Sequence, residues 1–180
     1  MKREPIEIIP FSKEHFSSLK NEVPDSRFLV QWAGNKYIFP LSWEQMSAFM
    51  DKKQNGKQVN YLFSAHARNI NVIIGHVQLT VADSEEKIGR VGSVLVFKRY
   101  RGRGFGNDLM KLIMNKGFIE MKMKELKLNV FGFNTPALRC YEKCGFRIDR
   151  RDEFRHEGEY WELVKMAMTR EDFYERKCCW

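Results

Sequence analysis

The chain has 180 residues, of which 43% are apolar and 30% charged. This balance predicts a globular protein with a sizeable core and excludes a disordered chain. The formal net charge of +8 is compatible with binding to nucleic acid, with binding to an anionic cofactor, or with solubility alone. We expect a single domain over residues 1–180, because no repeat, low-complexity segment or flexible linker divides the chain.

No apolar run approaches the length of a membrane span, and the N-terminus lacks the apolar stretch of a secretory signal. We therefore expect a cytoplasmic protein without a membrane partner. The cysteines offer no second pair with metal-ligand spacing, so we expect free thiols and no metal at Cys140, Cys144, Cys178 and Cys179.

The first third of the chain predicts one strand and two helices. Residues 6–11 are expected as the strand, and residues 12–23 as a helix with Ser12 at its N-cap. A loop with Gly34 and Pro40 follows. A short helix then begins after Ser42, with Gln45 at the capping-box position.

The middle third predicts an antiparallel meander and then a long helix. Residues 59–67, 71–82 and 88–97 are rich in β-branched and aromatic residues, and turn residues separate them. A helix is expected from Gly104 onward, because apolar residues recur on one broad side of it.

The last third predicts a strand over residues 126–131, a helix over 134–145 and a closing hairpin over 146–154 and 159–168. Asn134 is expected to cap the helix, and Gly145 to end it in the left-handed conformation. The complete order of elements predicts an α/β protein with a mixed sheet.

A glycine-rich, basic stretch, "VFKRYRGRGFGNDLM", joins the third strand of the meander to the long helix. It matches neither a Rossmann fingerprint, because Asn107 replaces the third glycine, nor a Walker A loop. Glycines at 102, 104 and 106 allow successive backbone N–H groups to point at one anion at a helix N-terminus. Arg101 and Arg103 would add charge. On spacing alone, a simple glycine-rich turn is an equal alternative.

A second pattern lies about thirty residues further on, in "NVFGFNTPALRCYEKCGF". Asn134, Ala137 and Tyr141 are separated by three and four positions, so they share one face of the predicted helix. The structural alternative is that Tyr141 packs in the core with its hydroxyl at the edge.

Together these residues resemble the GNAT superfamily of CoA-dependent N-acyltransferases. Arg101, Gly104 and Gly106 match its motif (Arg/Gln)-x-x-Gly-x-(Gly/Ala), and residues 134–146 match Asn-x-x-Ala-x-x-x-Tyr-x-x-x-Gly-Phe. The closing "GEYWELVKMAM" is similar to the branch that acetylates protein N-termini or polyamines. The resemblance implies a mixed, largely antiparallel twisted sheet with helices on both faces. It also implies a V-shaped splay between the fourth and fifth strands.

The resemblance further implies acetyl-CoA as co-substrate and assigns roles to matching positions. Backbone groups of Val94 and Val96 would pair with pantetheine, and an N–H near Leu95 or Val96 would polarise the thioester. Tyr141 would protonate or hydrogen-bond the departing sulfur. The other positions implied to bind the cofactor are Arg101, Gly102, Arg103, Gly104, Phe105, Gly106, Asn134 and Ala137.

The implied reaction is direct attack by an amine on acetyl-CoA, in a monomer or homodimer. The acceptor would be a protein N-terminus, a polyamine or another small amine. No general base is assigned: the family's position falls on Arg90, and His76, Glu159 and Glu162 each have a structural alternative.

Four aromatic residues between positions 32 and 43 are candidates for the wall of an amine pocket. Core packing is the alternative for at least two of them: Trp32, Tyr37, Phe39 and Trp43.

Two other functional classes stay open. The chain could bind acetyl-CoA as a sensor without turnover, or it could be a basic nucleic-acid-binding domain. No nucleic acid is expected, because no helix-turn-helix, zinc-finger or RNA-recognition pattern is present.

Overall fold

The structure is a computed structural model that describes residues 4–177. The free thiols expected at Cys178 and Cys179 therefore lie outside the described residues. The chain divides into two compact units, which we describe separately. Unit 1 comprises Met1–Thr80 and Val91–Ile113, and unit 2 comprises Val81–Arg90 and Met114–Trp180.

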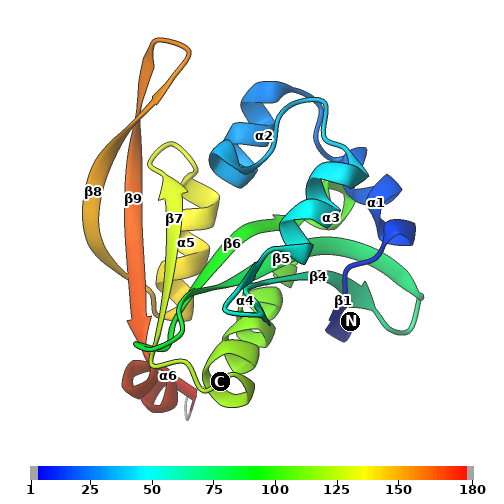
Figure 1. Cartoon of the computed structure of the whole chain (residues 1–180). Helices are drawn as coiled ribbons and strands as arrows, with labels where there is room; N and C mark the ends of the chain where they lie inside the picture. Colours follow the sequence, from blue (N-terminus) through cyan, green and yellow to red (C-terminus); the bar gives the residue numbers. More distant parts are fainter. Residues whose placement is uncertain (1–3, 178–180) are drawn as a thin grey trace. The chain divides into compact units, whose positions relative to one another are not determined.

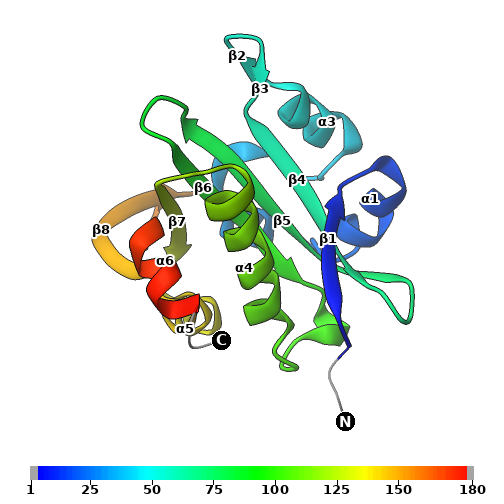
Figure 2. The same cartoon turned by 90° about the horizontal axis from the view of Figure 1, so that it is seen from below.

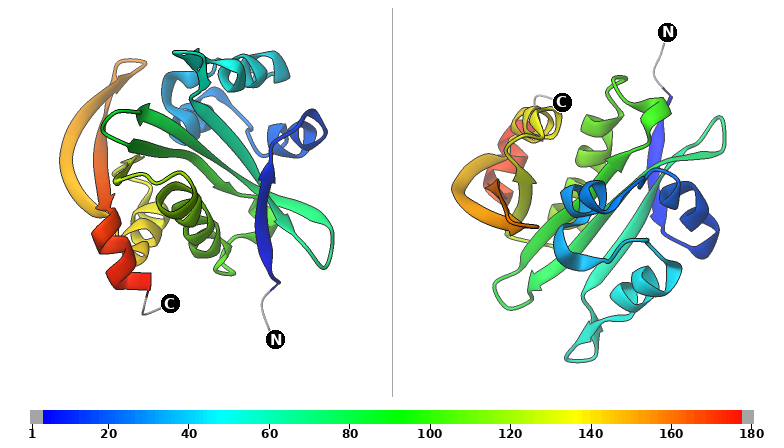
Figure 3. Two further views of the ribbon diagram at one scale, coloured as in Figure 1. Left: turned by 60° about the horizontal axis from the view of Figure 1, so that its bottom comes forward. Right: turned by 90° about the horizontal axis from the view of Figure 1, so that it is seen from above.

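Unit 1 is built on a sheet with helices on both of its faces. Its strands are β1 (Ile6–Pro10), β4 (Asn60–Ala67), most of β5 (Val72–Asp83) and the second half of β6 (Ile88–Val96). β4 pairs antiparallel with both β1 and β5. Helices α1 (Lys13–Lys20), α2 (Ser26–Ala33) and α3 (Trp43–Asp51) lie on one face, and α4 (Phe105–Asn115) lies on the other (Figure 3).

The core of unit 1 lies between helices α1 to α3 and the sheet. Leu19, Leu29 and Met46 each come from a different one of these helices, and each is at most 1% exposed. They pack with Leu62 and Leu95, which point from β4 and β6 toward the same side. Helix formation in α1 to α3 is thus supported by burial of one apolar face against the strands.

Unit 2 contains β7 (Glu125–Phe131), the β8 (Arg147–His156) and β9 (Glu159–Thr169) hairpin, and helices α5 (Thr135–Cys144) and α6 (Arg170–Lys177). β9 pairs antiparallel with both β7 and β8, and the hairpin is orange in Figure 1. Helices α5 and α6 lie side by side (Figure 2), and the Arg176 guanidinium donates to the Lys143 carbonyl at 3.0 Å.

A π-helical turn (Lys116–Glu120) follows α4 and packs against β7. A Cβ on Gly117 would lie 2.9 Å from the end of the Leu126 side chain, so a larger residue here would displace that side chain. Phe118, which follows it, is fully buried against Phe173 of α6.

The seven main strands hydrogen-bond in the order β1-β4-β5-β6-β7-β9-β8. The pairs between β6 and β7 are parallel and join Ile88–Arg90 to Glu125–Lys127, after which both strands continue. The V-shaped splay implied between these two strands stays a prediction. The predicted fold class, a mixed α/β domain with a largely antiparallel sheet between helices, is confirmed.

Sequence patterns missed several short elements, including the 3-10 turns Gly34–Lys36 and Lys98–Tyr100, and assigned one contact wrongly. Helices α2 and α6 and a small hairpin, β2 (Lys53–Gln54) with β3 (Lys57–Gln58), were not predicted. The predicted cap at Ser42 is confirmed, because its hydroxyl accepts from the Gln45 N–H at 3.3 Å. The capping box also predicts a hydrogen bond from the Gln45 side chain back to the Ser42 backbone N–H, and this prediction is wrong. That amide bonds the backbone of Ile38 and Pro40 instead, and so holds the preceding loop.

Candidate functional site

The glycine-rich loop between β6 and α4 places backbone donors at a helix N-terminus. Gly102 and Gly104 have φ values of 73° and 84°, which favour glycine. The Gly104 carbonyl accepts from the Asn107 N–H at 3.1 Å, so Gly104 caps α4. The first N–H groups of a helix have no carbonyl partner within it, and those of Phe105 and Gly106 belong to this first turn. The arrangement can bind an anion.

Arg101 is fixed within this loop by two contacts. Its Nε donates to the Val96 carbonyl at 2.8 Å, and its Nη2 lies 3.8 Å from the Glu22 carboxylate. The same carboxylate accepts from the Lys98 N–H at 2.8 Å. Glu22, which sequence analysis missed, therefore ties the end of α1 to this loop. No local sequence signal points to it, because 76 residues separate Glu22 from Lys98.

Two other loop residues contribute in different ways. The Phe105 side chain is 5% exposed and packs against the Tyr100 ring, with ring centroids 6.4 Å apart. Its side chain is therefore turned into the protein, and its predicted part in cofactor binding would fall to the backbone N–H. Arg103 is exposed.

Successive side chains at the end of β6 point alternately into the core of unit 1 and to the opposite face of the strand. Leu95 is 7% exposed within the core, whereas Val94 and Val96 are half-buried. β5 and β6 approach so closely here that a Cβ on Gly75 would lie 2.5 Å from the Leu95 carbonyl oxygen. The Val96 carbonyl oxygen accepts one hydrogen bond from Arg101 and has a second lone pair that can accept from another donor.

In unit 2, helix α5 presents the second predicted set of residues. Asn134 precedes the helix, and its carbonyl accepts from the Ala137 N–H at 3.1 Å. The predicted capping by the Asn134 side chain is wrong, because that side chain makes no cap hydrogen bond. Gly145 has a φ of 105° and ends the helix as predicted.

Tyr141 is 8% exposed and lies near Cys140 and Cys144, neither of which forms a disulfide. Burial raises the pKa of its phenol, and the neighbouring Cys140 and Cys144 raise this pKa further. The phenol therefore stays protonated at neutral pH. Because its pKa is well above that of an ordinary thiol, Tyr141 is better suited to donate a hydrogen bond to a thiolate than to give up its proton.

The three candidate bases have other roles in the structure. His76 is 1% exposed, and burial followed by the charge of Lys36 lowers its pKa to about 3. The Glu159 carboxylate accepts from the Trp161 indole at 2.9 Å, and the Glu162 carboxylate pairs with the Arg151 guanidinium at 2.7 Å. These contacts favour the structural alternative for each residue.

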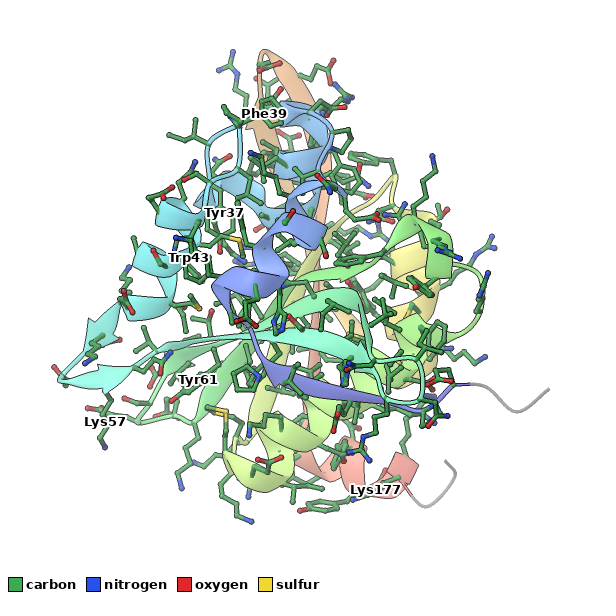
Figure 4. The ribbon with its side chains drawn as sticks, turned by 90° about the vertical axis from the view of Figure 1, so that its right-hand side faces the viewer. Tyr37, Phe39, Trp43, Lys57, Tyr61 and Lys177 are labelled. Carbon is green, nitrogen blue, oxygen red and sulfur yellow. The ribbon has the colours of Figure 1, made fainter. Side chains whose placement is uncertain are left out.

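The four aromatic residues predicted near an amine pocket divide between core and surface. Tyr37 is buried in the core of unit 1, and Trp32 and Trp43 pack partly buried against it. Phe39 is 42% exposed on the loop before α3. Figure 4 labels Tyr37, Phe39 and Trp43. Core packing thus accounts for three of the four.

The predicted cofactor residues fall into two groups. Unit 1 holds Val94–Val96 and the loop residues 101–106, and the bond from Arg101 to the Val96 carbonyl links the strand to the loop. Unit 2 holds Asn134, Ala137 and Tyr141. Among residues 4–177, no three His, Cys, Asp or Glu side chains are grouped as metal ligands. No helix in that range is long and apolar enough to cross a membrane.

Comparison with known proteins matches residues 26–146 to the acetyltransferase (GNAT) family. An SPbeta prophage-derived uncharacterized N-acetyltransferase of Bacillus subtilis is 28% identical over 138 residues, 75% of each chain. A spermine/spermidine N(1)-acetyltransferase of the same organism is 30% identical over 77 residues, which cover 42% of this chain and 51% of the relative.

The fold is similar to that of solved acetyltransferases. The crystal structure of spermidine N-acetyltransferase from Vibrio cholerae, in complex with CoA and spermine, superposes with a TM-score of 0.79. The two sequences are 17% identical, and the match covers 94% of this chain and 98% of the other.

Proposed function

The chain belongs to the acetyltransferase (GNAT) family, and from this premise we propose that it acetylates a primary amine in a ternary complex with acetyl-CoA. The family membership makes it an acetyl-CoA-dependent N-acetyltransferase. The proposed acceptor is a protein N-terminus, a polyamine or another small amine. We propose that residues 1–180 act as one N-acetyltransferase domain.

The observation that carries this proposal is the loop between β6 and α4. Gly102 and Gly104 have left-handed backbones, and α4 begins immediately after them. Such a turn directs several N–H groups toward one position, where a pyrophosphate is stabilised by hydrogen bonds and by the helix dipole. Arg103 adds positive charge nearby, and Arg101 fixes the turn to β6 through the Val96 carbonyl.

We assign the thioester to the end of β6. Pantetheine amides would pair with the backbone of Val94 and Val96, as an added strand pairs with a sheet edge. An N–H near Leu95 or Val96 would then donate to the thioester carbonyl. Stabilising the developing oxyanion in this way contributes about 3–4 kcal/mol per donor.

We assign the departing thiolate to Tyr141. As the amine nitrogen bonds to the carbonyl carbon, the C–S bond breaks and its electron pair stays on sulfur. The nitrogen loses one proton to solvent, and the thiolate later takes one from solvent to give free CoA. A phenol that keeps its own proton stabilises this charge by donating a hydrogen bond. The raised pKa of Tyr141 supports this form of assistance rather than full proton transfer.

No side chain is assigned as the general base. His76 is too weak a base at a pKa of about 3, and Glu159 and Glu162 are engaged elsewhere. An α-amino group, with a pKa of about 7.7–8.0, reaches its reactive form near neutral pH far more readily than an alkylamine at about 10.4. The proposal therefore needs an acceptor amine that is partly deprotonated at the working pH or that loses its proton when binding removes it from water.

Release of free thiol from acetyl-CoA, measured over a panel of amines, tests the proposal. The panel should include short peptides with free N-termini, spermidine and single amino acids. We expect amine-dependent release with at least one class, and no acetyl group on the intact protein after incubation with acetyl-CoA alone. Binding of acetyl-CoA without release for any amine would contradict catalysis.

A further inference from the structure

Unit 1 contains a polar cluster within its apolar core, which we call the Lys36 cluster. Four of its side chains are buried, each at most 5% exposed, whereas its lysine is an exposed residue that reaches in from the surface. The cluster is defined by five side chains: Lys36, Tyr37, His76, Gln78 and Ser93. Together they carry one formal positive charge and no negative charge.

The ammonium of Lys36 is held at the centre of this cluster. Its Nζ donates to Gln78 Oε1 at 3.0 Å and to Ser93 Oγ at 3.1 Å, and it lies 5.7 Å from the Phe49 ring centroid. A Cβ on Gly92 would approach this nitrogen to 3.0 Å, so the glycine makes room for the ammonium beside β6. The charge therefore has a defined position.

The hydrogen bonds also fix the proton on His76. Because Gln78 Oε1 accepts from Lys36 and from Ser93, the amide nitrogen faces the other way. It donates to the Tyr37 hydroxyl at 2.8 Å and toward His76 Nε2 at 3.4 Å. Since an amide NH₂ only donates, His76 Nε2 is the acceptor and the ring proton lies on Nδ1.

This proton has no hydrogen-bond partner among the described residues, although the His76 side chain is 1% exposed. The indole N–H of Trp32, whose ring centroid is 5.6 Å from that of His76, is also buried without a partner in this part of the chain. Buried polar groups normally have partners. Among the described residues, the region thus combines the Lys36 cation with two buried N–H donors, those of His76 and Trp32, that have no acceptor.

The position of the cluster connects it with the proposed reaction. Ser93 directly precedes Val94–Val96, where we assign the thioester, and its φ of 47° interrupts the extended backbone of β6. A group bound against Ser93 would therefore lie next to the strand that holds the acetyl donor.

We propose that the Lys36 cluster binds a carboxylate of the acceptor, so that the preferred substrate is an α-amino acid or another amine with a nearby carboxylate. This inference rests on the proposed function. A carboxylate supplies acceptor oxygens and the opposite charge, and hydrogen bonds to charged groups are the stronger class. A polyamine would instead bring a second ammonium toward Lys36, and like charges repel.

The test compares amino acids with their own carboxamides, using the full chain and acetyl-CoA. We suggest L-alanine, L-leucine and L-phenylalanine, their amides, and spermidine, with rates corrected for the fraction of free amine. We expect kcat/KM to be about 10–100-fold higher for at least one acid than for its amide. Spermidine should be the poorest acceptor. A wild-type ratio of one or below for all three pairs overturns the inference without any variant.

The variant Lys36→Met removes the charge and keeps much of the side-chain volume. The acid-to-amide ratio should fall at least about tenfold, while kcat/KM for the amide changes little. Lys57→Met makes the same chemical change on the exposed β3 strand and should leave the ratio unchanged. Figure 4 labels Lys57 and Tyr37. An acetyl-CoA-induced thermal shift equal to that of the wild type would show that the variant is folded.

The outcomes separate this inference from the proposed function. An equal loss of kcat/KM for the acid and the amide in Lys36→Met would show that Lys36 only stabilises the loop before α3, and would overturn the inference. Thiol release with spermidine alone would also overturn it, yet would leave the acetyltransferase function in place. Release with none of the amines, despite binding of acetyl-CoA, would contradict both.

Discussion

At the scale of single residues, the two groups with assigned chemistry are held in different ways. Tyr141 is buried by its helix and keeps its proton because burial raises the pKa of its phenol. Arg101 is exposed but is positioned by a hydrogen bond to the Val96 carbonyl and by the nearby Glu22 carboxylate. The first residue should act on the leaving group, and the second on the shape of the anion-binding loop.

Tyr141→Phe removes the hydroxyl and retains the ring that contacts Phe146. We expect kcat to fall by about 10–1000-fold, the usual effect of losing a group that stabilises charge in the transition state. KM for acetyl-CoA and the unfolding temperature should change little, because the interaction strengthens only as sulfur becomes negative. Steady-state kinetics and thermal unfolding provide the measurement. Tyr174→Phe, at a 48% exposed position on α6, is the matched control. Turnover at the native rate would show that another group assists the thiolate.

Arg101→Lys keeps the positive charge but loses the Nε donor to Val96. The dissociation constant for acetyl-CoA should rise by about 3–10-fold, the equivalent of one net hydrogen bond. Arg103→Lys makes the same exchange at an exposed position two residues on and should have a smaller effect. The affinities can be measured by calorimetry. Equal effects of the two changes would mean that the bond from Arg101 to the Val96 carbonyl does not organise the loop.

At the scale of elements, the decisive unit is the junction of β6, its glycine loop and α4. Glycine spacing predicted a turn at this junction, and the second motif, over residues 134–146, favoured an anion site there over a simple glycine-rich turn. Helices α2 and α6 escaped prediction for local reasons. "FLVQW" in α2 has the apolar, aromatic composition of a strand, although the Asp25 carboxylate caps the helix through the Phe28 N–H at 2.7 Å. Helix α6 is almost entirely polar, with Phe173 as its buried residue.

The capping signals of both missed helices were present in the sequence. Thr169 and Asp172 form a reciprocal pair at the start of α6: the Asp172 N–H donates to the Thr169 hydroxyl oxygen at 3.2 Å, and the Thr169 N–H donates to the Asp172 carboxylate at 3.4 Å. Cap residues would thus have identified α2 and α6 where apolar periodicity did not.

Gly104→Val places a β-branched side chain at a φ of 84° in the loop. We expect a loss of roughly 1–3 kcal/mol in stability from backbone strain, and loss of the rise in unfolding temperature that acetyl-CoA produces. Gly158→Val is a close control, because Gly158 has a φ of 83° and open space around its missing Cβ, in the turn between β8 and β9. It should be strained to a similar extent yet respond normally to acetyl-CoA. A normal ligand response in Gly104→Val would remove this loop from the phosphate site.

At the scale of the whole molecule, the order of elements and the two motifs were sufficient to predict the fold class and the acetyl donor. The order of elements and the two motifs did not predict which amine is the acceptor. The Lys36 cluster joins residues 42 and 57 positions apart, brought together by the sheet and the loop before α3. No periodicity marks such a set, since each member is an ordinary polar residue in its own segment. His76 illustrates the point: its burial in a strand was expected, but the unsatisfied Nδ1 proton depends on the orientation of Gln78.

The central claim is that acetyl groups pass from acetyl-CoA to an amine on this chain. The most direct measurement counts the acetylated amine by mass spectrometry and the free thiol by its absorbance in one reaction with the best acceptor. We predict one acetylated amine for each thiol released, with both falling together in Tyr141→Phe. Thiol release without acetylated amine, or neither product with any amine while acetyl-CoA binds, would contradict the account.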